Sequence, residues 1–484
     1  MNNMYTFDTS TLWAALPEIF LLSAIVVVLL LDLFLTKPFK QATYYLMQIS
    51  LFITGLIAFN LIDQPQIIIF SGSFILDNMA SVFKLFMIGS TMVAMVYTRH
   101  YLTQHALFRG EYFVLVLLSV LGMMVMVSGY SLLTLYLGLE ILSLSLYTLI
   151  AIARERAGAV EAALKYFVLG AIASGLLLYG MSMIYGISGS INITDIANFA
   201  ANADLASRET LILNFGLVFL AIGIAFKLGA VPFHMWVPDV YEGAPTSVTL
   251  FLSTVPKVAA VAMLVRILVD GLGAMHAYWA DLFMVLAVLS IALGSVVALM
   301  QTNIKRLLAY STISHVGFIM LGFVTGVISG YGAAVFYVLV YILMSLAAFG
   351  IVILLNKKGF EADQISDFKG LSKYSPWFAL MMLVVMLSMA GIPPFIGFYA
   401  KFFILQQVIS AGFVTLAVVA VVFAVISAYY YLQIIKSMYF EEADKDITIT
   451  APMDMQLVLS INAVLILVVG IFPDFLIKLS LSLF

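Results

Sequence analysis

The chain has 484 residues, of which 64% are hydrophobic and only 10% are charged, and its formal net charge is −3. A soluble domain is about half apolar and about a quarter charged, so this composition excludes a single water-soluble core. Cysteine is absent, which excludes disulfides, thiolate-held iron–sulfur clusters and Cys-ligated zinc.

Long apolar runs follow one another along almost the whole chain. A helix needs about 20 apolar residues to cross a bilayer. Runs such as "LLSAIVVVLLLDLFL" and "LVLLSVLGMMVMV" are continuous rather than alternating, which favours helices over barrel strands. The sequence therefore predicts an all-α polytopic membrane protein with fourteen transmembrane helices. The predicted segments are residues 12–35, 43–62, 75–98, 112–128, 131–152, 162–187, 211–241 (broken), 244–269, 278–300, 304–327, 331–355, 376–409 (broken), 412–437 and 455–480.

The distribution of lysine and arginine between the loops predicts the orientation in the membrane, because basic loops stay cytoplasmic. With the N-terminus outside, fourteen basic residues fall in inner loops and two in outer loops. We therefore expect both termini on the periplasmic side of a bacterial inner membrane. The first span has full length and no basic segment before it, so we expect a retained helix rather than a cleaved signal. The inner residues are Lys37, Lys40, Arg99, Arg109, Arg154, Arg156, Lys305, Arg306, Lys357, Lys358, Lys369, Lys373, Lys436 and Lys445, and the outer ones are Arg208 and Lys478.

The other six basic residues fall within predicted spans, where a charge costs about 2.5–3.5 kcal/mol and usually marks a pathway or a paired polar site. Three of them have an ordinary explanation. Lys165 lies one turn from Glu161, and Arg266 lies one turn from Asp270, so local pairing or snorkelling accounts for both. Lys84 lies in the outer half of its span, where interfacial lysines are common.

Lys227, Lys257 and Lys401 need a different explanation. Lys257 and Lys401 have no acidic residue within a turn on either side, so their partners must come from other helices or from water. Glu140 is a carboxylate in the middle of a helix without a local base, which makes it the expected cross-helix partner of one lysine. We predict that these four residues are functional, and the alternative is a purely structural buried salt bridge.

Two of the predicted spans are interrupted by the same short pattern, because residues 229–233 and 391–395 both read GxxPF. Proline and glycine open a membrane helix where protein or water satisfies the freed backbone, and such breaks build ion sites. Breaks at corresponding places indicate a repeat, and units of five helices, an odd number, are inverted. Two unrelated proline kinks are the alternative. We expect three N-terminal helices over residues 1–111, a first repeat over 112–270, a second repeat over 278–440 and a C-terminal helix over 441–484.

Lysine suits proton exchange inside a membrane, because a desolvated ammonium gives up its proton readily and a nearby carboxylate holds it. An approach of Glu140 would keep the proton on Lys227, and separation would release it. His234 and His315 are weaker candidates, because a buried histidine is as often a hydrogen-bonded structural residue. The predicted midplane relay consists of Glu140, Lys227, Lys257, His315 and Lys401.

The sequence has no pattern for a redox cofactor, a metal or a nucleotide. Its five histidines form no i,i+4 pair and no HExxH motif, and neither a Walker loop nor a GxGxxG motif opens a helix. We therefore expect no cofactor or metal in this chain, and any electrons handled by the system are carried elsewhere.

Four stretches carry a resemblance to a known family. They are "AFKLGAVPFHMWVPDVYEGAPTSVTLFLSTVPKVA", "LYLGLEILSLSLY", "QTNIKRLLAYSTISHVGF" and "LSMAGIPPFIGFYAKFFIL". Over essentially its whole length the chain resembles the antiporter-like membrane subunits of respiratory complex I, and most closely the subunit N group of bacterial NADH-quinone oxidoreductases. The resemblance implies fourteen helices with two inverted five-helix repeats, each containing a broken helix.

The resemblance also implies roles for single residues. The family's helix-five glutamate falls on Glu140, its broken-helix lysine on Lys227, the next lysine on Lys257 and the second-half terminal residue on Lys401. The sister subunit M usually has glutamate at this last position, and the sister subunit L continues into a long lateral helix, so both features favour the N group. In this family NADH, FMN, iron–sulfur clusters and quinone belong to partner subunits. The expected partners are other complex I membrane subunits and lipid, without nucleic acid.

Two functions from different classes remain open at this point. The first is a proton-translocating module that couples NADH-to-quinone electron transfer in other subunits to proton pumping. The second is a membrane subunit of a multi-subunit cation/proton antiporter, which uses the same fold without electron transfer. The stretch "HMWVPDVYEGAP" and Lys401 favour the first. A purely structural scaffold would leave four midplane charges unexplained, at about 2.5 kcal/mol or more apiece.

Overall fold

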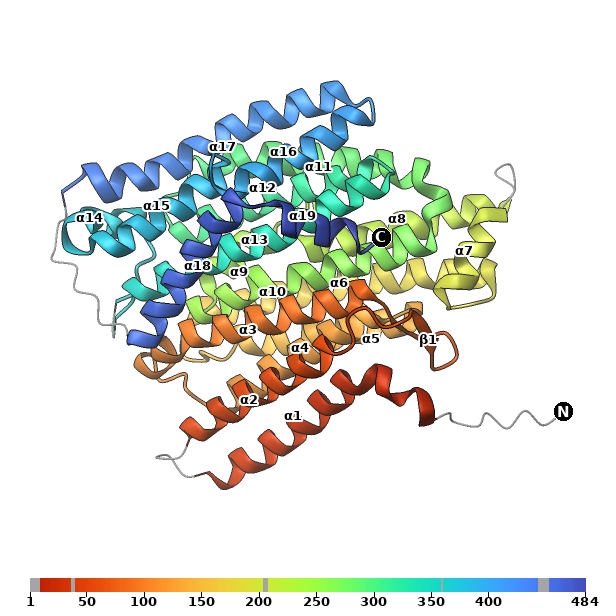
Figure 1. Ribbon diagram of the computed structural model, residues 1–484, viewed down its shortest axis with the longest axis horizontal. Helices are drawn as coiled ribbons and strands as arrows, with labels where there is room; N and C mark the ends of the chain where they lie inside the picture. Colours follow the sequence, from red (N-terminus) through yellow and green to blue (C-terminus); the bar gives the residue numbers. More distant parts are fainter. Residues whose placement is uncertain (1–8, 36–39, 203–207, 358–359, 443–451) are drawn as a thin grey trace.

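The computed structural model describes residues 9–35, 40–202, 208–357, 360–442 and 452–484, which form an elongated bundle of helices (Figure 1). In these ranges thirteen helices are long and apolar enough to cross a membrane. The remaining predicted segment, 376–409, holds two shorter apolar helices, α15 (Pro376–Ala390) and α16 (Ile396–Ser410). The prediction of an all-α polytopic membrane protein is confirmed. Three of the inner-loop basic residues, Lys37, Lys358 and Lys445, lie outside the described residues.

The N-terminal part consists of three membrane helices and a small hairpin. A short helix, η1 (Thr9–Ala15), leads into α1 (Leu16–Phe34), which is followed by α2 (Gln41–Phe59) and α3 (Asn78–Gln104). Between α2 and α3, the strands β1 (Ile67–Ile69) and β2 (Phe74–Leu76) pair antiparallel, with Ile67 opposite Leu76. Helix α3 starts after Asp77, because this side chain accepts a hydrogen bond from the backbone N–H of Ala80 at 2.8 Å.

The middle of the chain contains the first broken segment. Its helices are α4 (Gly110–Ser128), α5 (Leu132–Ile150), α6 (Ala157–Ser188), α7 (Ile193–Asn202), α8 (Arg208–Leu228), α9 (Trp236–Gly243) and α10 (Thr246–Leu264). Helix α10 continues as a π-helical turn, η3 (Val265–Gly271), and a short 3-10 turn, η4 (Gly273–Met275), follows. The first break thus separates α8 from α9.

The second broken segment lies between α15 and α16. The other elements of this part are α11 (His276–Ala298), α12 (Ile304–Val324), α13 (Ile328–Leu355), η5 (Ile365–Phe368), α14 (Leu371–Tyr374) and α17 (Val414–Phe440). The chain then forms α18 (Met453–Ile471) and α19 (Asp474–Leu481).

The two broken segments have similar surroundings. Helix α4 packs on α5, and α11 packs on α12. Both pairs approach closely through glycine: a Cβ on Gly138 would lie 2.8 Å from the Gly122 oxygen, and a Cβ on Gly294 would lie 2.7 Å from the Ser314 nitrogen. Helix α6 lies against α8 and α9, and α13 lies against α15 and α16. Each broken segment is therefore packed against an unbroken helix, α6 for the first and α13 for the second.

The bundle has two different ends (Figure 1). The end that we call the hairpin end carries β1, β2 and α7. There a backbone bridge joins Ser131 to Asn192, and the Asn192 amide donates to the Ser71 carbonyl at 3.2 Å. The opposite end carries α14 and is called the basic end below. The turn of Arg156 and the first turn of α12, which contains Arg306, lie beside the segment that precedes α14, because Arg156 pairs with Glu361 and the Ile304 N–H donates to the Asp363 carbonyl at 2.7 Å.

Three features of this arrangement were not predicted. The β hairpin and α7 both lie in connections at the hairpin end, and α7, with ten residues, is too short to span a bilayer. The last predicted span, 455–480, is divided: α18 ends at Ile471 and α19 starts at Asp474. Pro473 lies at this point and has no backbone N–H with which to continue a helix.

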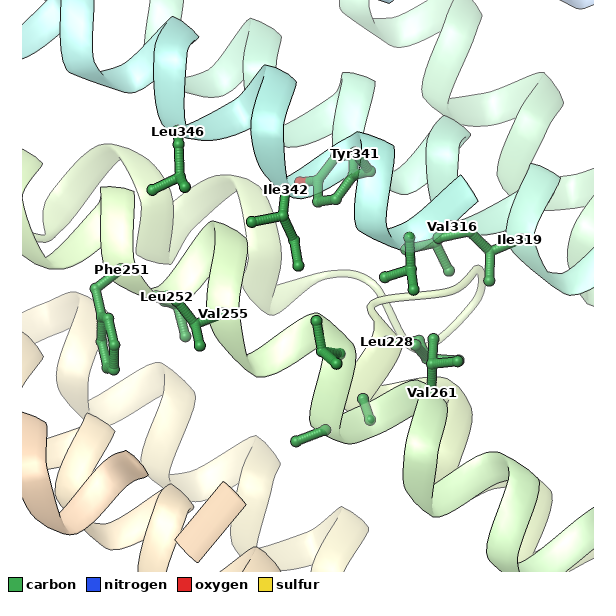
Figure 2. Packing of buried hydrophobic residues seen from close by; sticks show 14 of the residues in the cluster. Leu228, Phe251, Leu252, Val255, Val261, Val316, Ile319, Tyr341, Ile342 and Leu346 are labelled. Carbon is green, nitrogen blue, oxygen red and sulfur yellow. The ribbon is translucent and has the colours of Figure 1, made fainter. Parts of the chain in front are cut away.

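Helix α10 lies in the centre of the molecule, and all of its residues are buried. Figure 2 shows part of this packing, with Leu252 and Val255 on α10 and Ile342 and Leu346 on α13. A charged group on such a helix cannot reach solvent or lipid headgroups, so it needs polar partners inside the protein. Lys257 is on this helix.

Candidate proton-transfer site

The first broken segment ends α8 with a free carbonyl that binds a lysine. Gly229 has φ +81°, a left-handed conformation that suits glycine, and the N–H groups of Gly229 and Ala230 turn back to the Ala225 carbonyl at 2.9 and 2.8 Å. A helix end leaves its last carbonyls without backbone partners. One of them, the Leu228 oxygen, accepts a hydrogen bond of 2.7 Å from Lys257 Nζ. Lys257 thus places a cation at the negative end of α8.

The second broken segment repeats this arrangement. Gly391 has φ +85°, and its N–H donates to the Leu387 carbonyl at 3.1 Å. Lys401 Nζ donates to the Met389 and Ala390 carbonyls at 3.0 and 2.9 Å. The lysine comes from α16, directly after the break, whereas Lys257 comes from α10. Both lysines nevertheless bind the carbonyl end of the helix that precedes a break.

Lys257 and Lys401 are both deeply buried, with 2% and 8% of their surface exposed. Within the described part of the chain, neither ammonium has a carboxylate oxygen within 4.0 Å. Each lies instead above an aromatic ring, Lys257 at 5.5 Å from the Trp236 ring centroid and Lys401 at 5.7 Å from that of Phe318. Neutral oxygens and π-electrons are thus the surroundings of both cations.

Lys227 and Glu140 lie near each other but are held by different serines. Lys227 Nζ donates to Ser143 Oγ at 2.6 Å, and Ser143 in turn donates to the Leu139 carbonyl at 2.5 Å. Glu140 accepts a hydrogen bond from Ser174 of α6. Within the described residues, no ion pair of 4.0 Å or less joins Lys227 to Glu140. The predicted partners therefore stand in a separated arrangement, in which Ser143 substitutes for the carboxylate.

A small cavity lies between Lys227 and Lys257. Its volume is about 10 Å³, close to the least volume that holds one water molecule. Both lysines line it together with Tyr166 and Trp236. Lys227 and Lys257 thus line the same water-sized space.

His315 lies in a hydrogen-bonded network of the second half. Its Nδ1 lies 2.8 Å from the Tyr337 hydroxyl and its Nε2 lies 3.1 Å from the Tyr431 hydroxyl. Tyr431 continues the network to Ser311 at 2.5 Å. The ring connects α12, α13 and α17, and it has no direct hydrogen bond to Lys401 among the described residues.

Tyr341 and Thr312 were not predicted as site residues, although they lie between the two halves. The Tyr341 hydroxyl donates to the Ser253 carbonyl of α10 at 3.0 Å, and it lies 2.9 Å from Thr312 Oγ1. Ser253 precedes Lys257 by one turn, and Thr312 precedes His315 by three residues. The sequence contains 24 tyrosines, so no signal distinguished this one.

Among the described residues, no contact joins the His234 side chain to the predicted relay residues. It belongs to the loop between α8 and α9, beside the exposed Met235, and its buried Nδ1 has no hydrogen-bond partner. In the described residues no ion pair or side-chain hydrogen bond joins it to Lys227 or Lys257. In the described part of the chain, no three His, Asp or Glu side chains are grouped so that they could hold a metal ion.

A cluster of charged residues surrounds Glu361 at the basic end. Glu361 accepts hydrogen bonds from Arg156 and from the Tyr101 hydroxyl, the latter at 3.0 Å, and Lys305 Nζ lies 3.8 Å away. Burial by itself raises the pKa of Glu361, but the Lys305 charge and the Arg156 hydrogen bond lower it below its ordinary value. The pKa of His105 is lowered by burial and by the Arg156 charge. The Glu361 charge raises this pKa but does not offset them. The cluster joins α3, the start of α6 and α12.

The other three basic residues of the predicted spans, Lys84, Lys165 and Arg266, are paired. The predicted pairs of Lys165 with Glu161 and Arg266 with Asp270 are confirmed, at 2.9 and 3.0 Å. Each base also has a partner from another element, since Lys165 binds Asp239 of α9 at 2.7 Å and Arg266 binds Asp77 at 2.8 Å. The buried Lys84 pairs at 2.6 Å with Glu18 of α1, which the sequence did not suggest. These pairings contrast with the unpaired cations of Lys257 and Lys401.

The chain is similar to curated proteins over its full length. The family model described as NADH:quinone oxidoreductase/Mrp antiporter, transmembrane, matches residues 129–427. The NADH-quinone oxidoreductase subunit N of Ruthia magnifica subsp. Calyptogena magnifica is 82% identical over 484 residues, which is 100% of both chains. The subunit N of Thioalkalivibrio sulfidiphilus is 49% identical over 475 residues, which is 98% of each chain.

Solved structures share the fold. A chain of respiratory complex I from Thermus thermophilus with bound aureothin has a TM-score of 0.81 and 30% identity, covering 96% of this chain and 98% of its own. A chain of an archaeal membrane-bound sulfane sulfur reductase has a TM-score of 0.85 and 26% identity, with 97% of each chain covered. A chain of the Mrp complex from Dietzia has a TM-score of 0.81 at 21% identity, covering 98% and 97%. The chain therefore belongs to the NADH:quinone oxidoreductase/Mrp antiporter family of membrane proteins, and within it to subunit N of NADH-quinone oxidoreductase, a translocase complex.

Proposed function

We propose that this chain is a proton-translocating subunit in the bacterial inner membrane. Electrons pass from NADH to quinone in partner subunits that hold FMN and iron–sulfur clusters, and this chain moves protons. The surroundings of Lys257 and Lys401 carry the proposal. Both side chains are buried and donate to backbone carbonyls at the helix breaks, and among the described residues neither has a carboxylate within 4.0 Å. A structural cation inside a membrane is normally paired. An ammonium that has to lose and regain a proton is better served by neutral oxygens.

The contacts suggest the order in which protons move. Glu140 controls Lys227, since its approach in place of Ser143 would hold the proton on this lysine and its withdrawal would release the proton towards the cavity. The cavity leads to Lys257, and the hydroxyl network leads from the neighbourhood of Lys257 to the second half. The proposed path runs through Glu140, Lys227, Lys257, Tyr341, Thr312, His315 and Lys401. We leave His234 outside it, because its contacts join it to none of these residues.

The similar packing around the two breaks supports a division into two repeats. We propose a first repeat over residues 112–270 and a second over 278–440, of inverted orientation, between N-terminal helices (1–111) and a C-terminal helix (441–484). The basic end faces the cytoplasm in this proposal, as the distribution of lysine and arginine requires. Other complex I membrane subunits and lipid cover the apolar sides.

A cation/proton antiporter subunit is the other function within this family. The Mrp chain is only 21% identical to this one, so the similarity shows a shared fold and does not favour a shared function. The relative at 82% identity is named subunit N of NADH-quinone oxidoreductase, and this supports the redox-driven function. Purification of the native assembly separates the two: we expect flavin and iron–sulfur absorption in the complex, and an assembly without redox centres would favour the antiporter.

Substitution of Lys227 tests the relay. We expect Lys227→Ala to lower NADH-driven proton pumping at least about tenfold, as for loss of an acid–base group. Lys227→Arg should fail nearly as badly, because a guanidinium keeps its proton in proteins. Pumping is measured as acidification of inverted membrane vesicles, together with NADH:quinone activity, after a native gel has established assembly.

The control is Lys436→Ala, which removes an exposed lysine at the end of α17 and should leave pumping unchanged. Full pumping by an assembled Lys227→Arg complex would contradict the relay, because a residue that needs only its charge tolerates arginine. Lys227 would then be a structural partner of Ser143 and Glu140.

A further inference from the structure

The hydrogen bond of Tyr341 to the first half ends on a backbone carbonyl. Its hydroxyl donates to the Ser253 oxygen of α10 at 3.0 Å, and the neighbouring Thr312 hydroxyl donates to the Leu308 oxygen at 2.8 Å. A carbonyl oxygen accepts hydrogen bonds but has no hydrogen of its own to pass on. A proton that moves from the lysines to the second half therefore needs another group with an exchangeable hydrogen.

Tyr241 of α9 is a fully buried tyrosine whose hydroxyl lacks a regular hydrogen bond. Its side chain is 0% exposed, and no described residue offers its hydroxyl a hydrogen bond of proper geometry. The ring is held edge-on by Trp236 and by Phe349 of α13, at centroid distances of 6.5 and 6.2 Å. Because a buried polar group without a partner is costly, this hydroxyl calls for an explanation in terms of function.

The side chains that interact with this hydroxyl come from both halves. From the second half they are Thr312 of α12, on which α9 packs, and Tyr341 of α13. From the first half, Tyr166 of α6 interacts with Tyr241 electrostatically, and Tyr166 also lines the cavity between the two lysines. Tyr241 thus interacts with a residue of that cavity and with both hydroxyls of the second half.

The two hydroxyls of the second half have fewer hydrogens than contacts. Thr312 Oγ1 lies 2.9 Å from the Tyr341 hydroxyl, and each of the two also reaches its own carbonyl. Two hydrogens therefore serve three contacts, and one contact is always without a hydrogen. A third hydroxyl that donates to Thr312 supplies the missing one. With Tyr241 included, the O–H bonds can all point the same way, from α9 through α12 to α13.

We propose that Tyr241 is a relay residue that passes protons from the first half to the Thr312–Tyr341 pair. The inference rests on the proposed function and adds to it the group that joins the two halves. In each transfer, a proton from the lysine side forms an O–H bond on Tyr241 while the hydrogen already there moves to Thr312. The Thr312 hydrogen moves to Tyr341, and the Tyr341 hydrogen passes to His315, whose ring centroid lies 5.5 Å from that of Tyr341.

The transfer is balanced. An ammonium of the first half becomes a neutral amine, the imidazole of His315 becomes an imidazolium, and each of the three hydroxyls ends with the one hydrogen with which it began. No bond to carbon changes and no electron is exchanged, so the step needs no further reactant.

Tyr241→Phe tests the proposal, because it keeps the ring and removes only the hydroxyl. We expect NADH-driven proton pumping in inverted vesicles to fall at least about tenfold, since a positioned acid–base group contributes about 10²–10⁴-fold. The dissociation temperature of the assembled complex on native gels should not fall, because this hydroxyl has no hydrogen bond to lose. A residue with a merely structural role would show the opposite pattern.

Thr312→Val removes the next hydroxyl and keeps the shape of the side chain. It should lower pumping similarly, and pumping by the double variant should lie within about twofold of the more severe single variant, because both changes interrupt the same step. Tyr112→Phe is the matched control. Tyr112 of α4 is also 0% exposed with an unpartnered hydroxyl, but Thr98 and Ser247, its hydroxyl neighbours, lie outside the proposed path. Its pumping should stay unchanged.

Full pumping by assembled Tyr241→Phe or Thr312→Val would overturn the role of Tyr241, and so would an equal loss in Tyr112→Phe. A lower dissociation temperature of Tyr241→Phe together with lost pumping would assign the residue to structure. Failure of the proposed function is distinguishable, because it appears as full pumping in Lys227→Arg with Tyr241 unchanged.

Discussion

At the scale of single residues, the serines decide how Glu140 and Lys227 are arranged. Ser143 lies one turn after Glu140 on α5 and accepts the hydrogen bond of Lys227, while Ser174 donates to Glu140 from α6. The carboxylate and the ammonium therefore each have a neutral partner when they are apart. In the proposed switch these neutral partners stabilise the separated arrangement, because a buried charge without a hydrogen bond is costly.

Glu140→Gln should impair coupled turnover, because the amide has the shape of the carboxyl group but no charge with which to hold the proton on Lys227. Glu140→Asp keeps the charge on a shorter side chain and should be milder. We expect a loss of at least about tenfold for glutamine, since a positioned acid–base group contributes about 10²–10⁴-fold. NADH-driven pumping in vesicles with assembled complex is the measurement, and equal activity of the two variants would argue against a role for the charge.

At the scale of elements, the two breaks use the same chemistry with lysines from different helices. Aligning the two GxxPF patterns places Asp239, not a lysine, opposite Lys401. In the folded chain, Lys257 of α10 occupies the place that Lys401 occupies in the second half, since both bind carbonyls at the end of the preceding helix. The contact of a lysine with the freed carbonyls is thus preserved by the fold rather than by the register of the sequence.

Gly391→Ala should disturb the second break directly. The residue has φ +85°, and a Cβ there would lie 2.9 Å from Lys401 Cδ. Gly412→Ala is a matched control, because Gly412 has φ +89° but nothing within 4 Å of its Cβ position. Both variants bear a strain of about 1–2 kcal/mol for a left-handed residue. We expect pumping to fall severalfold more in Gly391→Ala, and equal pumping in both would show that displacement of Lys401 is harmless.

The Glu361 cluster links elements from distant parts of the chain. Glu361→Gln removes the counter-charge of Arg156 and Lys305, and we expect a destabilisation of about 1–3 kcal/mol, seen as a lower dissociation temperature of the assembled complex on native gels. Glu442→Gln is the control, because its ion pair with Lys373 is exposed and contributes little.

The pH dependence of this effect follows from the lowered pKa of Glu361. A carboxylate with a lowered pKa stabilises the folded state fully above the ordinary glutamate pKa of about 4.3. Its contribution disappears as the pH falls through the lowered value. The difference between wild type and Glu361→Gln should therefore be constant near neutral pH and vanish in strong acid, and a difference that grows on acidification would contradict the assignment.

At the scale of the whole molecule, orientation can be tested without background labelling of this chain, because the chain has no cysteine. The exposed Thr103 and Ser366 mark the basic end, and the exposed Ala201 of α7 marks the hairpin end. Single Thr103→Cys and Ser366→Cys variants should react with an impermeant maleimide only in inverted vesicles, and Ala201→Cys only in intact spheroplasts. Labelling with the opposite sidedness would reverse the proposed orientation.

Much of this protein follows from local properties of the sequence. Continuous apolar runs require helices in lipid, because backbone polar groups have no other partner there, and the all-α membrane fold is accordingly visible from composition and run length. The GxxPF patterns mark the two breaks, because glycine and proline act on their own stretch of backbone. Lys257 and Lys401 stand out because no acid lies within a turn of either.

Only the tertiary structure decided which groups meet. The Leu228 carbonyl binds Lys257, 29 residues away along the chain, and Glu361 joins Arg156 across 205 residues. Such contacts depend on how helices pack, and nothing in the local sequence near Glu361 indicates them. The contacts of Ser143 and Tyr341 were equally invisible, because serines and aromatic residues are frequent in membrane helices and only packing decides which neighbours lie beside them.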